Sequence, residues 1–391
     1  MLMRGVGATG KAASRMTVTF PLDFPDSGVY AGGMEKPTMA DIAKAVGVSK
    51  NTVSLALRGS PRISGETRQR VTDAAAALGY QLNPTVAHLM AELRQSRSPG
   101  FQATLALVNA YEKPDAFTAH PTIPYYVRGC KERAKQLGYQ LDEFWLHQPD
   151  MPVSRWISIL RARNIRGILV VGLMRQNRLP AHLARLWEEF PTIVTGVRTR
   201  EPALSFACAD HHALALEAYE QAVKLGYQRP ALVLDGVIDE LTEGRFTAGF
   251  LTAQSRLTPD SRRTQPFYQV AEARRNIHLF RDWFDTNRPD VIFTLYHEVK
   301  RWLTELGHRV PGDVGLVQYE WRADHADWAG MDQRNDLVGA AALDMLISMV
   351  HHNEHGVPEH PRATMISPHW TPGLTAVPAG KSKPARKKNS P

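Results

Sequence analysis

The chain has 391 residues, enough for two or three domains, and its 43% hydrophobic and 22% charged residues are typical of a folded protein rather than a disordered one. Its net charge of +8 is unevenly distributed: residues 1–100 carry 12 basic and 7 acidic side chains, residues 381–391 carry 5 basic and none acidic, and residues 101–380 carry 30 basic and 32 acidic. This asymmetry indicates a polyanionic partner for the ends of the chain and a different role for its middle.

The sequence carries no signal for a membrane or for an oxidising compartment. No apolar run approaches the roughly 18 residues of a membrane span, and residues 1–20 lack the apolar core of a secretory signal, so we expect a cytoplasmic protein without membrane contacts. The two cysteines, Cys130 and Cys208, provide neither a disulfide framework nor metal-binding spacing. We expect two buried thiols, and no metal or cofactor.

Residues 1–36 are expected to form a disordered leader, because Gly, Ala, Ser and Pro recur there without a sustained period. The leader contains Gly5-Val-Gly7-Ala-Thr-Gly10, the spacing of a dinucleotide-binding turn. Such a turn needs a strand before it, and only four residues precede this one. We therefore do not interpret it as a cofactor site.

Residues 37–82 are predicted to fold as three short helices. Thr38 is expected to cap the first helix and Gly47 to end it, while Ser49 and Ser64 begin the second and third. A helix, a glycine turn and a second helix that opens with polar side chains form a helix-turn-helix pattern, and such a second helix fits the major groove of DNA. An ordinary pair of packed helices is the alternative interpretation.

Residues 83–100 are predicted to be a short helix followed by a linker, since Asn83 is a natural cap, Pro84 suits the first helical position, and Pro99-Gly100 breaks the pattern.

Residues 101–378 alternate between strand-like and helical patterns, and residues 379–391 are expected to be a basic, disordered tail. The strand-like runs are Thr104–Val108, Gly167–Val171, Thr192–Thr195, Ala231–Leu234, Asp290–Thr294 and Gly315–Val317. Amphipathic helical stretches lie between them, among them Tyr125–Leu137, Ala213–Leu225 and Leu337–Met349. This alternation predicts parallel sheets with helices on both faces, and the length of the segment favours two α/β lobes over one.

The chain resembles the lactose-repressor (LacI) family of bacterial transcription regulators from Pro37 to about Ala376. The phrases that carry the resemblance in the first domain are Asp41-Ile42-Ala43, Gly47-Val48-Ser49, Thr52-Val53-Ser54, Thr67-Arg68-Gln69-Arg70-Val71 and Leu78-Gly79-Tyr80. Those in the middle include Gly226-Tyr-Gln-Arg229, Val310-Pro311-Gly-Asp313 and Trp370-Thr-Pro-Gly373. The resemblance implies an α/β protein with a small all-α helix-turn-helix head and a two-lobed, periplasmic-binding-protein-like sensor with parallel sheets.

The resemblance also implies a function: a sequence-specific, DNA-binding transcriptional regulator, with repression as the expected mode. Such a protein binds a pseudo-palindromic operator in double-stranded DNA as a homodimer, under the control of a small-molecule effector for which carbohydrate is the candidate class. A transport protein would instead need an export signal and no DNA-binding head. An enzyme would need a nucleophile with a base, or a metal site, and the histidine-rich run 351–355 lacks metal-binding spacing. We therefore expect no enzymatic activity.

The family pattern places base-reading positions on Lys50, Asn51 and Leu55. Lys50 can donate to guanine and Asn51 can pair with adenine, whereas Leu55, where the family usually carries a polar residue, can offer apolar contact to a thymine methyl. Four further side chains are expected to contact phosphates, with capping or simple solvation as the alternative: Thr52, Ser54, Ser64 and Arg68. In the family's minor-groove hinge helix, Asn83 stands at the start and Leu89 at the wedge position, with packing inside the hinge as the alternative for Leu89.

The effector of the family binds between the two lobes, and the pattern places Arg245, Tyr296, Glu320 and Gln333 at or beside the binding positions. The phrase around Arg245 is one residue longer than the family's, so strict register would place Phe246 there instead. An arginine, a carboxylate and aromatic faces together suit a hydroxylated ligand such as a sugar.

Overall fold

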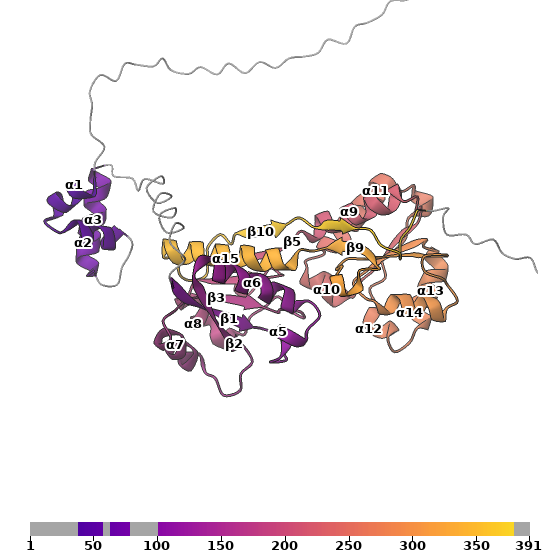
Figure 1. Cartoon of the computed structure of the whole chain (residues 1–391), viewed down its shortest axis with the longest axis horizontal. Helices are drawn as coiled ribbons and strands as arrows, with labels where there is room; N and C mark the ends of the chain where they lie inside the picture. The colour runs from indigo at the N-terminus through magenta and orange to yellow at the C-terminus, as the bar shows by residue number, and fades with distance from the viewer. Residues whose placement is uncertain (1–37, 58–62, 79–100, 379–391) are drawn as a thin grey trace, which may run out of the picture. The chain divides into compact units, whose positions relative to one another are not determined.

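A computed structural model describes residues 38–57, 63–78 and 101–378. The chain divides into two compact units, Met1–Gln81 and Leu82–Pro391, and each is described by itself (Figure 1). The predicted leader, the hinge helix with Asn83 and Leu89, and the basic tail lie outside the described residues. Within the described ranges, no helix has the length and apolar character that crossing a membrane requires.

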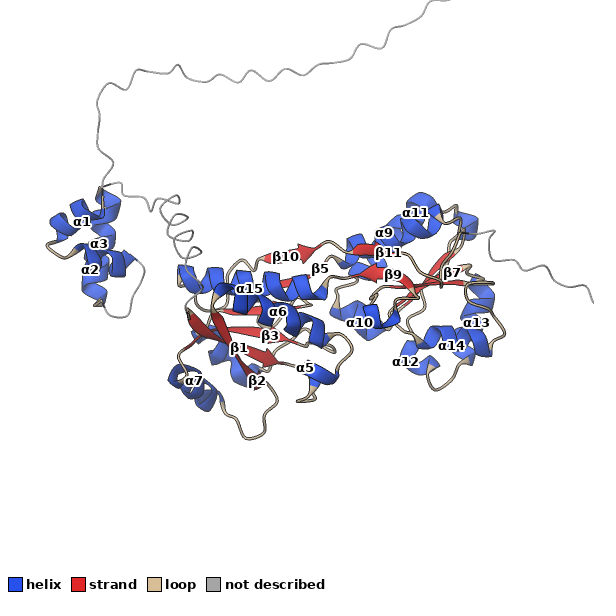
Figure 2. Ribbon diagram, in the orientation of Figure 1, coloured by secondary structure: helices blue, strands red, loops and turns tan. Residues whose placement is uncertain are grey.

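The first unit contains three short helices around one apolar core. They are α1 (Met39–Val46), α2 (Lys50–Leu57) and α3 (Gly65–Ala77). Ile42 of α1, Val53 of α2 and Val71 of α3 are fully buried in one cluster. Figure 2 shows the three helices lying together. The predicted number and order of helices in this segment are therefore confirmed.

The ends of these helices are fixed by local side chains, as the sequence predicts. Thr38 and Asp41 form a reciprocal capping box at the start of α1, and Gly47 ends that helix in the left-handed region at a φ of 74°. Ser49 accepts from the backbone N–H of Thr52 at 3.0 Å at the start of α2. The turn of the helix-turn-helix thus lies between the left-handed Gly47 at the end of α1 and the Ser49 cap at the start of α2.

Lobe 1 of the second unit is built on a six-stranded parallel sheet in the order β10-β5-β4-β3-β1-β2. Its strands are β1 (Ala103–Asn109), β2 (Tyr139–Trp145), β3 (Ile165–Val171), β4 (Thr192–Thr195), β5 (Ser205–Ala209) and β10 (Ala363–Ile366). Helices α7 (Val153–Ala162) and α8 (Ala184–Glu189), with the short η1 (Ala181–Leu183), bury apolar side chains on one face. Helices α5 (Ala116–Ala119), α6 (Ile123–Leu137) and α15 (Asn335–His352) cover the other (Figure 1).

Lobe 2 is built on a five-stranded sheet in the order β11-β9-β8-β7-β6, in which only the edge pair β11–β9 is antiparallel. Its strands are β6 (Pro230–Val233), β7 (Val291–Thr294), β8 (Gly315–Gln318), β9 (Ala329–Asp332) and β11 (His369–Thr371). Helices α9 (His211–Lys224) and α11 (Arg245–Leu257) pack on one face, and α12 (Val270–Ala273), α13 (His278–Asn287) and α14 (Glu298–Glu305) on the other. Shorter elements are α10 (Gly236–Leu241), η2 (Asp260–Arg262) and η3 (Ala323–His325).

The α/β class with parallel sheets is confirmed, and each predicted strand-like run corresponds to a strand of the structure. The sequence did not predict β2, β5, β9, β10 and β11. The chain passes between the lobes three times, after β5, after β9 and after β10. Cys130 and Cys208 are buried free thiols, as predicted.

Candidate functional site

The start of α2 presents the candidate DNA-reading surface of the first unit. Lys50 is the first residue of α2 and its side chain is exposed. The hydroxyl of Thr52 lies 2.8 Å from that of Ser49, so it takes part in the cap of the helix. Asn51, Ser54 and Leu55 follow on α2. The structure describes their backbone as helical but does not describe their side chains.

Two of the residues expected at phosphates also have structural roles. The hydroxyl of Ser64 accepts from the backbone N–H of Thr67 at 3.2 Å and so caps α3. The guanidinium of Arg68 donates to the carbonyl of Ile63 at 3.3 Å. The capping role foreseen as an alternative is thus present at Ser64, while the phosphate contacts of Thr52, Ser54, Ser64 and Arg68 stay predictions.

A residue that the sequence reasoning missed, Arg70, ties α3 to the turn of the helix-turn-helix. Its guanidinium donates to the carbonyl of Val46, the last residue of α1, at 3.0 Å. A basic side chain at the carboxyl end of a helix satisfies a carbonyl that the helix itself leaves unbonded. Arg70 therefore helps to fix where α1 ends and, through Gly47, where α2 begins.

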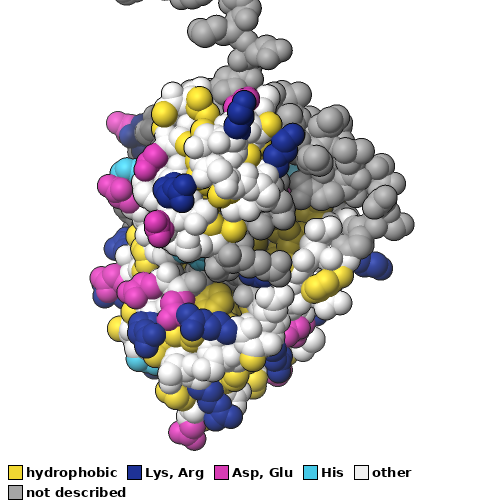
Figure 3. Space-filling model, turned by 90° about the vertical axis from the view of Figure 1, so that its left-hand side faces the viewer, with side chains coloured by type: hydrophobic (Ala, Val, Ile, Leu, Met, Phe, Trp, Pro, Cys, Tyr) yellow, Lys and Arg dark blue, Asp and Glu magenta, His cyan; other side chains and the backbone are white. Residues whose placement is uncertain are grey.

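Charge on the described helices of the first unit is nearly balanced. Residues 38–57 and 63–78 carry four basic and three acidic side chains. In the space-filling view, basic and acidic side chains are interspersed over the face shown (Figure 3). Much of the basic surplus of residues 37–100 therefore comes from residues outside the described ranges: Arg58, Arg62, Arg94 and Arg97.

In the second unit, Glu320 bridges the two lobes. It follows β8 in lobe 2, and its Oε2 accepts from the hydroxyl of Thr122 of lobe 1 at 3.0 Å. Its Oε1 accepts from the Nδ2 of Asn335, the first residue of α15, at 3.3 Å. Burial raises the pKa of the Glu320 carboxyl. We call this contact region between the lobes the seam, defined by Glu320, Thr122, Asn335, Arg245 and Cys208.

Arg245 reaches into the same seam from the first position of α11. Its Nε donates to the carbonyl of Thr242 at 2.9 Å, and its Nη1 donates to the Sγ of Cys208 on β5 of lobe 1 at 3.2 Å. Burial raises the pKa of the Tyr126 hydroxyl on α6, and the charges of Glu320 and Cys208 raise it further. Two of the four predicted effector residues, Arg245 and Glu320, thus each contact lobe 1 from lobe 2.

The other two predicted effector residues are bound within lobe 2. The hydroxyl of Tyr296 accepts from the backbone N–H of Asp235 at 3.1 Å, and the guanidinium of Arg274 lies over its ring, 5.3 Å from the centroid. Gln333 is buried, and its Nε2 donates to the carbonyl of Tyr319 at 2.8 Å. Their role toward an effector stays a prediction.

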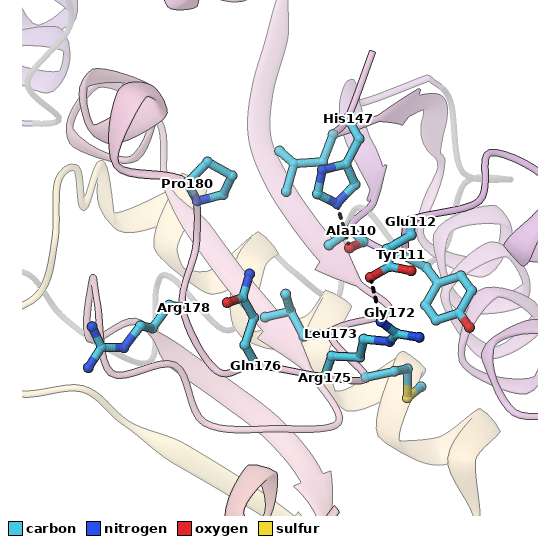
Figure 4. A pocket seen from close by; sticks show the side chains of 12 residues that line it. Ala110, Tyr111, Glu112, His147, Gly172, Leu173, Arg175, Gln176, Arg178 and Pro180 are labelled. Carbon is cyan, nitrogen blue, oxygen red and sulfur yellow. Dashed lines mark hydrogen bonds and ion pairs between the residues drawn. The ribbon is translucent and has the colours of Figure 1, made fainter. Parts of the chain in front are cut away.

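A small hollow of about 50 Å³, open to solvent, lies at the carboxyl ends of β1, β2 and β3 (Figure 4). Tyr111, His147 and Arg175 are among its lining residues, and none of the predicted site residues lines it. His147 is held to the carbonyl of Ala110 at 3.1 Å, and Arg175 pairs with Glu112 at 3.3 Å. Parallel sheets bind ligands at the carboxyl ends of their strands, at the point where the order of strands in the sheet reverses direction. In lobe 1 this point lies between β1 and β3, and a predicted strand order would have pointed to the hollow.

No group of three or more His, Cys, Asp or Glu side chains is placed to hold a metal ion within residues 38–57, 63–78 and 101–378. In the histidine-rich run, the Nε2 of His351 lies 2.8 Å from the hydroxyl of Tyr139.

Comparison with known proteins finds a family match for the first unit. The family model described as "Bacterial regulatory proteins, lacI family" matches residues 38–83. The HTH-type transcriptional regulator MalR of Streptococcus pneumoniae is 25% identical over 228 residues, which are 58% of this chain and 66% of MalR. The match therefore spans just under two thirds of that relative.

Two solved structures share the fold over most of the chain. The transcriptional regulator CelR–cellobiose complex has a TM-score of 0.54 at 21% identity and covers 87% of this chain and 99% of that one. The Lac repressor dimer bound to operator and the anti-inducer ONPF has a TM-score of 0.51 at 19% identity and covers 88% and 100%. At these identities the likeness concerns the fold alone, a unit of three short helices followed by two α/β lobes.

Proposed function

Because the chain belongs to the lacI family of bacterial regulatory proteins, we propose that it is a transcriptional regulator that binds operator DNA as a homodimer under the control of a small molecule. We propose that it acts as a repressor. We also propose that it acts in the bacterial cytoplasm. The observation that carries the proposal is the start of α2. Lys50, the first residue of this helix, is exposed and follows the Gly47 turn and the Ser49 cap. A helix presented in this way fits the major groove with its first turn toward the bases.

The packing of the first unit supports this role. A recognition helix must keep a fixed angle to the rest of its domain, because base contacts tolerate little displacement. Here α2 is held by the core around Val53, by the cap at Ser49 and, through the turn, by the Arg70–Val46 hydrogen bond. The amino end of α2 also favours nearby phosphate through its free N–H groups.

Asn51→Ala tests the assignment of a base-reading position. We expect it to relax the preference at one base pair by about 1–3 kcal/mol, because a bidentate amide contact to adenine is lost. Binding to a set of operator variants, each with one base pair changed, measures the effect. Gln69→Ala on α3 is the matched control, since it too removes a side-chain amide, in this case an exposed one. A loss of equal size on every sequence would contradict a base-reading role.

Leu89→Ala tests the minor-groove wedge, which lies outside the described residues and rests on the resemblance. An apolar side chain inserted between base steps kinks DNA and allows more contact. We expect the variant to weaken operator binding more than binding to unrelated DNA. Competition assays with both DNAs give the ratio, and an unchanged ratio contradicts the wedge. Leu374→Ala is the control, since Leu374 is a leucine of lobe 2 with an exposed side chain.

The seam is the place we propose for the effector. Arg245 and Glu320 of lobe 2 each form a hydrogen bond to lobe 1 there. A ligand that displaces these hydrogen bonds would therefore shift the equilibrium between different orientations of the two lobes. Coupling between an effector and DNA is typically about 1–3 kcal/mol. Carbohydrate is the class we propose, supported by the cellobiose complex of CelR and by the carboxylate and guanidinium in the seam.

A further inference from the structure

Arg245 of the seam and His211, whose ring packs against Phe246, each leave one buried nitrogen without a hydrogen-bond partner. These atoms are the Nη2 of Arg245 and the Nδ1 of His211. His211 is only 4% exposed, whereas Arg245 is half-buried and remains partly accessible. A buried donor without a partner destabilises a fold, and native structures keep few of them except where a ligand supplies the partner.

The packing of α9 against α11 brings these two side chains to one place. His211 is the first residue of α9, Arg245 is the first of α11, and the two helices lie side by side. Their close approach depends on Gly249, where an added Cβ would lie 2.3 Å from the carbonyl oxygen of His212. The ring of His211 lies 4.5 Å from that of Phe246. Burial and the neighbouring Arg245 lower the pKa of His211 to about 3.

Arg245 lacks the partner that a guanidinium usually has. Its Nη1 donates to the thiol of Cys208, which is a weak acceptor. The carboxylate of the seam, Glu320, is bound to Thr122 and Asn335. Glu243, two residues before Arg245, pairs with arginines of lobe 1 at 3.4 and 3.8 Å. Within the described part of the chain, no carboxylate lies within ion-pair distance of Arg245. The fork of donors on an arginine matches a carboxylate.

We propose that Arg245 and His211 form a carboxylate-binding pair, and that the effector is a sugar acid rather than a neutral sugar. One carboxylate oxygen accepts from the Nη2 of Arg245 and the other from the Nδ1–H of His211, while the hydroxyls of the sugar face Glu320. This inference rests on the proposed role of the seam as the effector site. It adds His211, which the sequence reasoning did not single out, as a specificity-determining residue.

Matched pairs of ligands test the class. We would measure binding to the full-length chain by calorimetry for D-glucuronate against D-glucose and D-galacturonate against D-galactose, with D-gluconate as an open-chain acid. Ionic strength is held constant, and sodium acetate controls for a general anion effect. We expect at least one acid to bind roughly 10- to 100-fold more tightly than its neutral parent, since a charge-assisted hydrogen bond is lost in the parent. Equal binding of acids and parents, or binding of none of the acids, would overturn the proposal.

Single variants then test the two residues. Arg245→Gln and His211→Asn are each expected to weaken binding of the acid about tenfold or more, and to weaken binding of the neutral parent clearly less. His211→Phe keeps a ring against Phe246 and serves where His211→Asn fails to fold. Arg256→Gln on α11 and His212→Asn on α9 are the matched controls. If the variants bind the acid with wild-type affinity, or lose affinity equally for the acid and its neutral parent, Arg245 and His211 do not form a carboxylate-binding pair.

Operator binding in the same preparations separates this inference from the proposed function. A chain that binds operator DNA but no sugar acid overturns the carboxylate-binding pair alone. A chain that binds no specific DNA overturns the proposed function.

Discussion

Removal of residues 1–82 is expected to abolish sequence-specific DNA binding and to leave both lobes folded. The first unit has its own core, centred on Ile42, Val53 and Val71, and the cores of the two lobes are formed by other residues. The division at Gln81 also places the three helices and the lobes in separate compact units. Fluorescence anisotropy with operator DNA measures the binding, and circular dichroism with thermal unfolding measures the fold of the remaining chain.

Removal of residues 1–36 alone is the control for this truncation. It leaves α1 and its cap at Thr38 in place, so we expect operator binding close to that of the full chain. If the chain that starts at residue 83 binds the operator with the sequence preference of the full-length chain, the DNA-reading surface lies in the lobes and our account of the first unit is wrong.

Gly47→Val is expected to eliminate DNA binding through the backbone of the turn. Gly47 has a φ of 74°, in the left-handed region that costs an L-residue roughly 1–2 kcal/mol, and a β-branched residue more. A three-helix unit of this size has little stability to lose. Hydrogen exchange should show faster exchange in α1 and α2, with exchange in the lobes unchanged, and anisotropy should show lost operator binding.

Gly65→Ala provides a matched control within the same unit. Gly65 opens α3 with an ordinary φ, and a Cβ placed there meets nothing within 4 Å. We expect this variant to be neutral or slightly stabilising, because alanine restricts the unfolded chain and favours helix. Equal loss of DNA binding in both variants would show that the left-handed turn is not the cause.

The parts of the fold that sequence reasoning predicted are those fixed by local chemistry. The capped ends of α1, α2 and α3 depend on side chains within four residues of the helix ends, such as Thr38 and Ser64. Buried parallel strands such as β3 and β7 are continuous apolar runs and are recognisable for that reason. The edge strands β2 and β10 carry exposed residues along their length and give no comparable pattern.

The candidate site was only partly predictable, because much of it depends on contacts between distant segments. Arg245 and Glu320 could be placed by family resemblance, and the structure brings both to the seam. The packing of His211 against Phe246 and the bond from Arg70 to Val46 depend on residues 35 and 24 positions away. His211 has no distinctive sequence context, and the family phrase that contains Arg70 does not reveal its partner, so the structure was needed to find both contacts.

The binding preference of the full-length chain for DNA drawn from a random pool tests the central claim most directly. The sequences retained after several rounds of selection should share a pseudo-palindromic site with two half-sites, as a two-fold dimer with a helix-turn-helix in each subunit requires. A pool with no enriched sequence, or the same enrichment by a chain that lacks residues 1–82, would contradict the account.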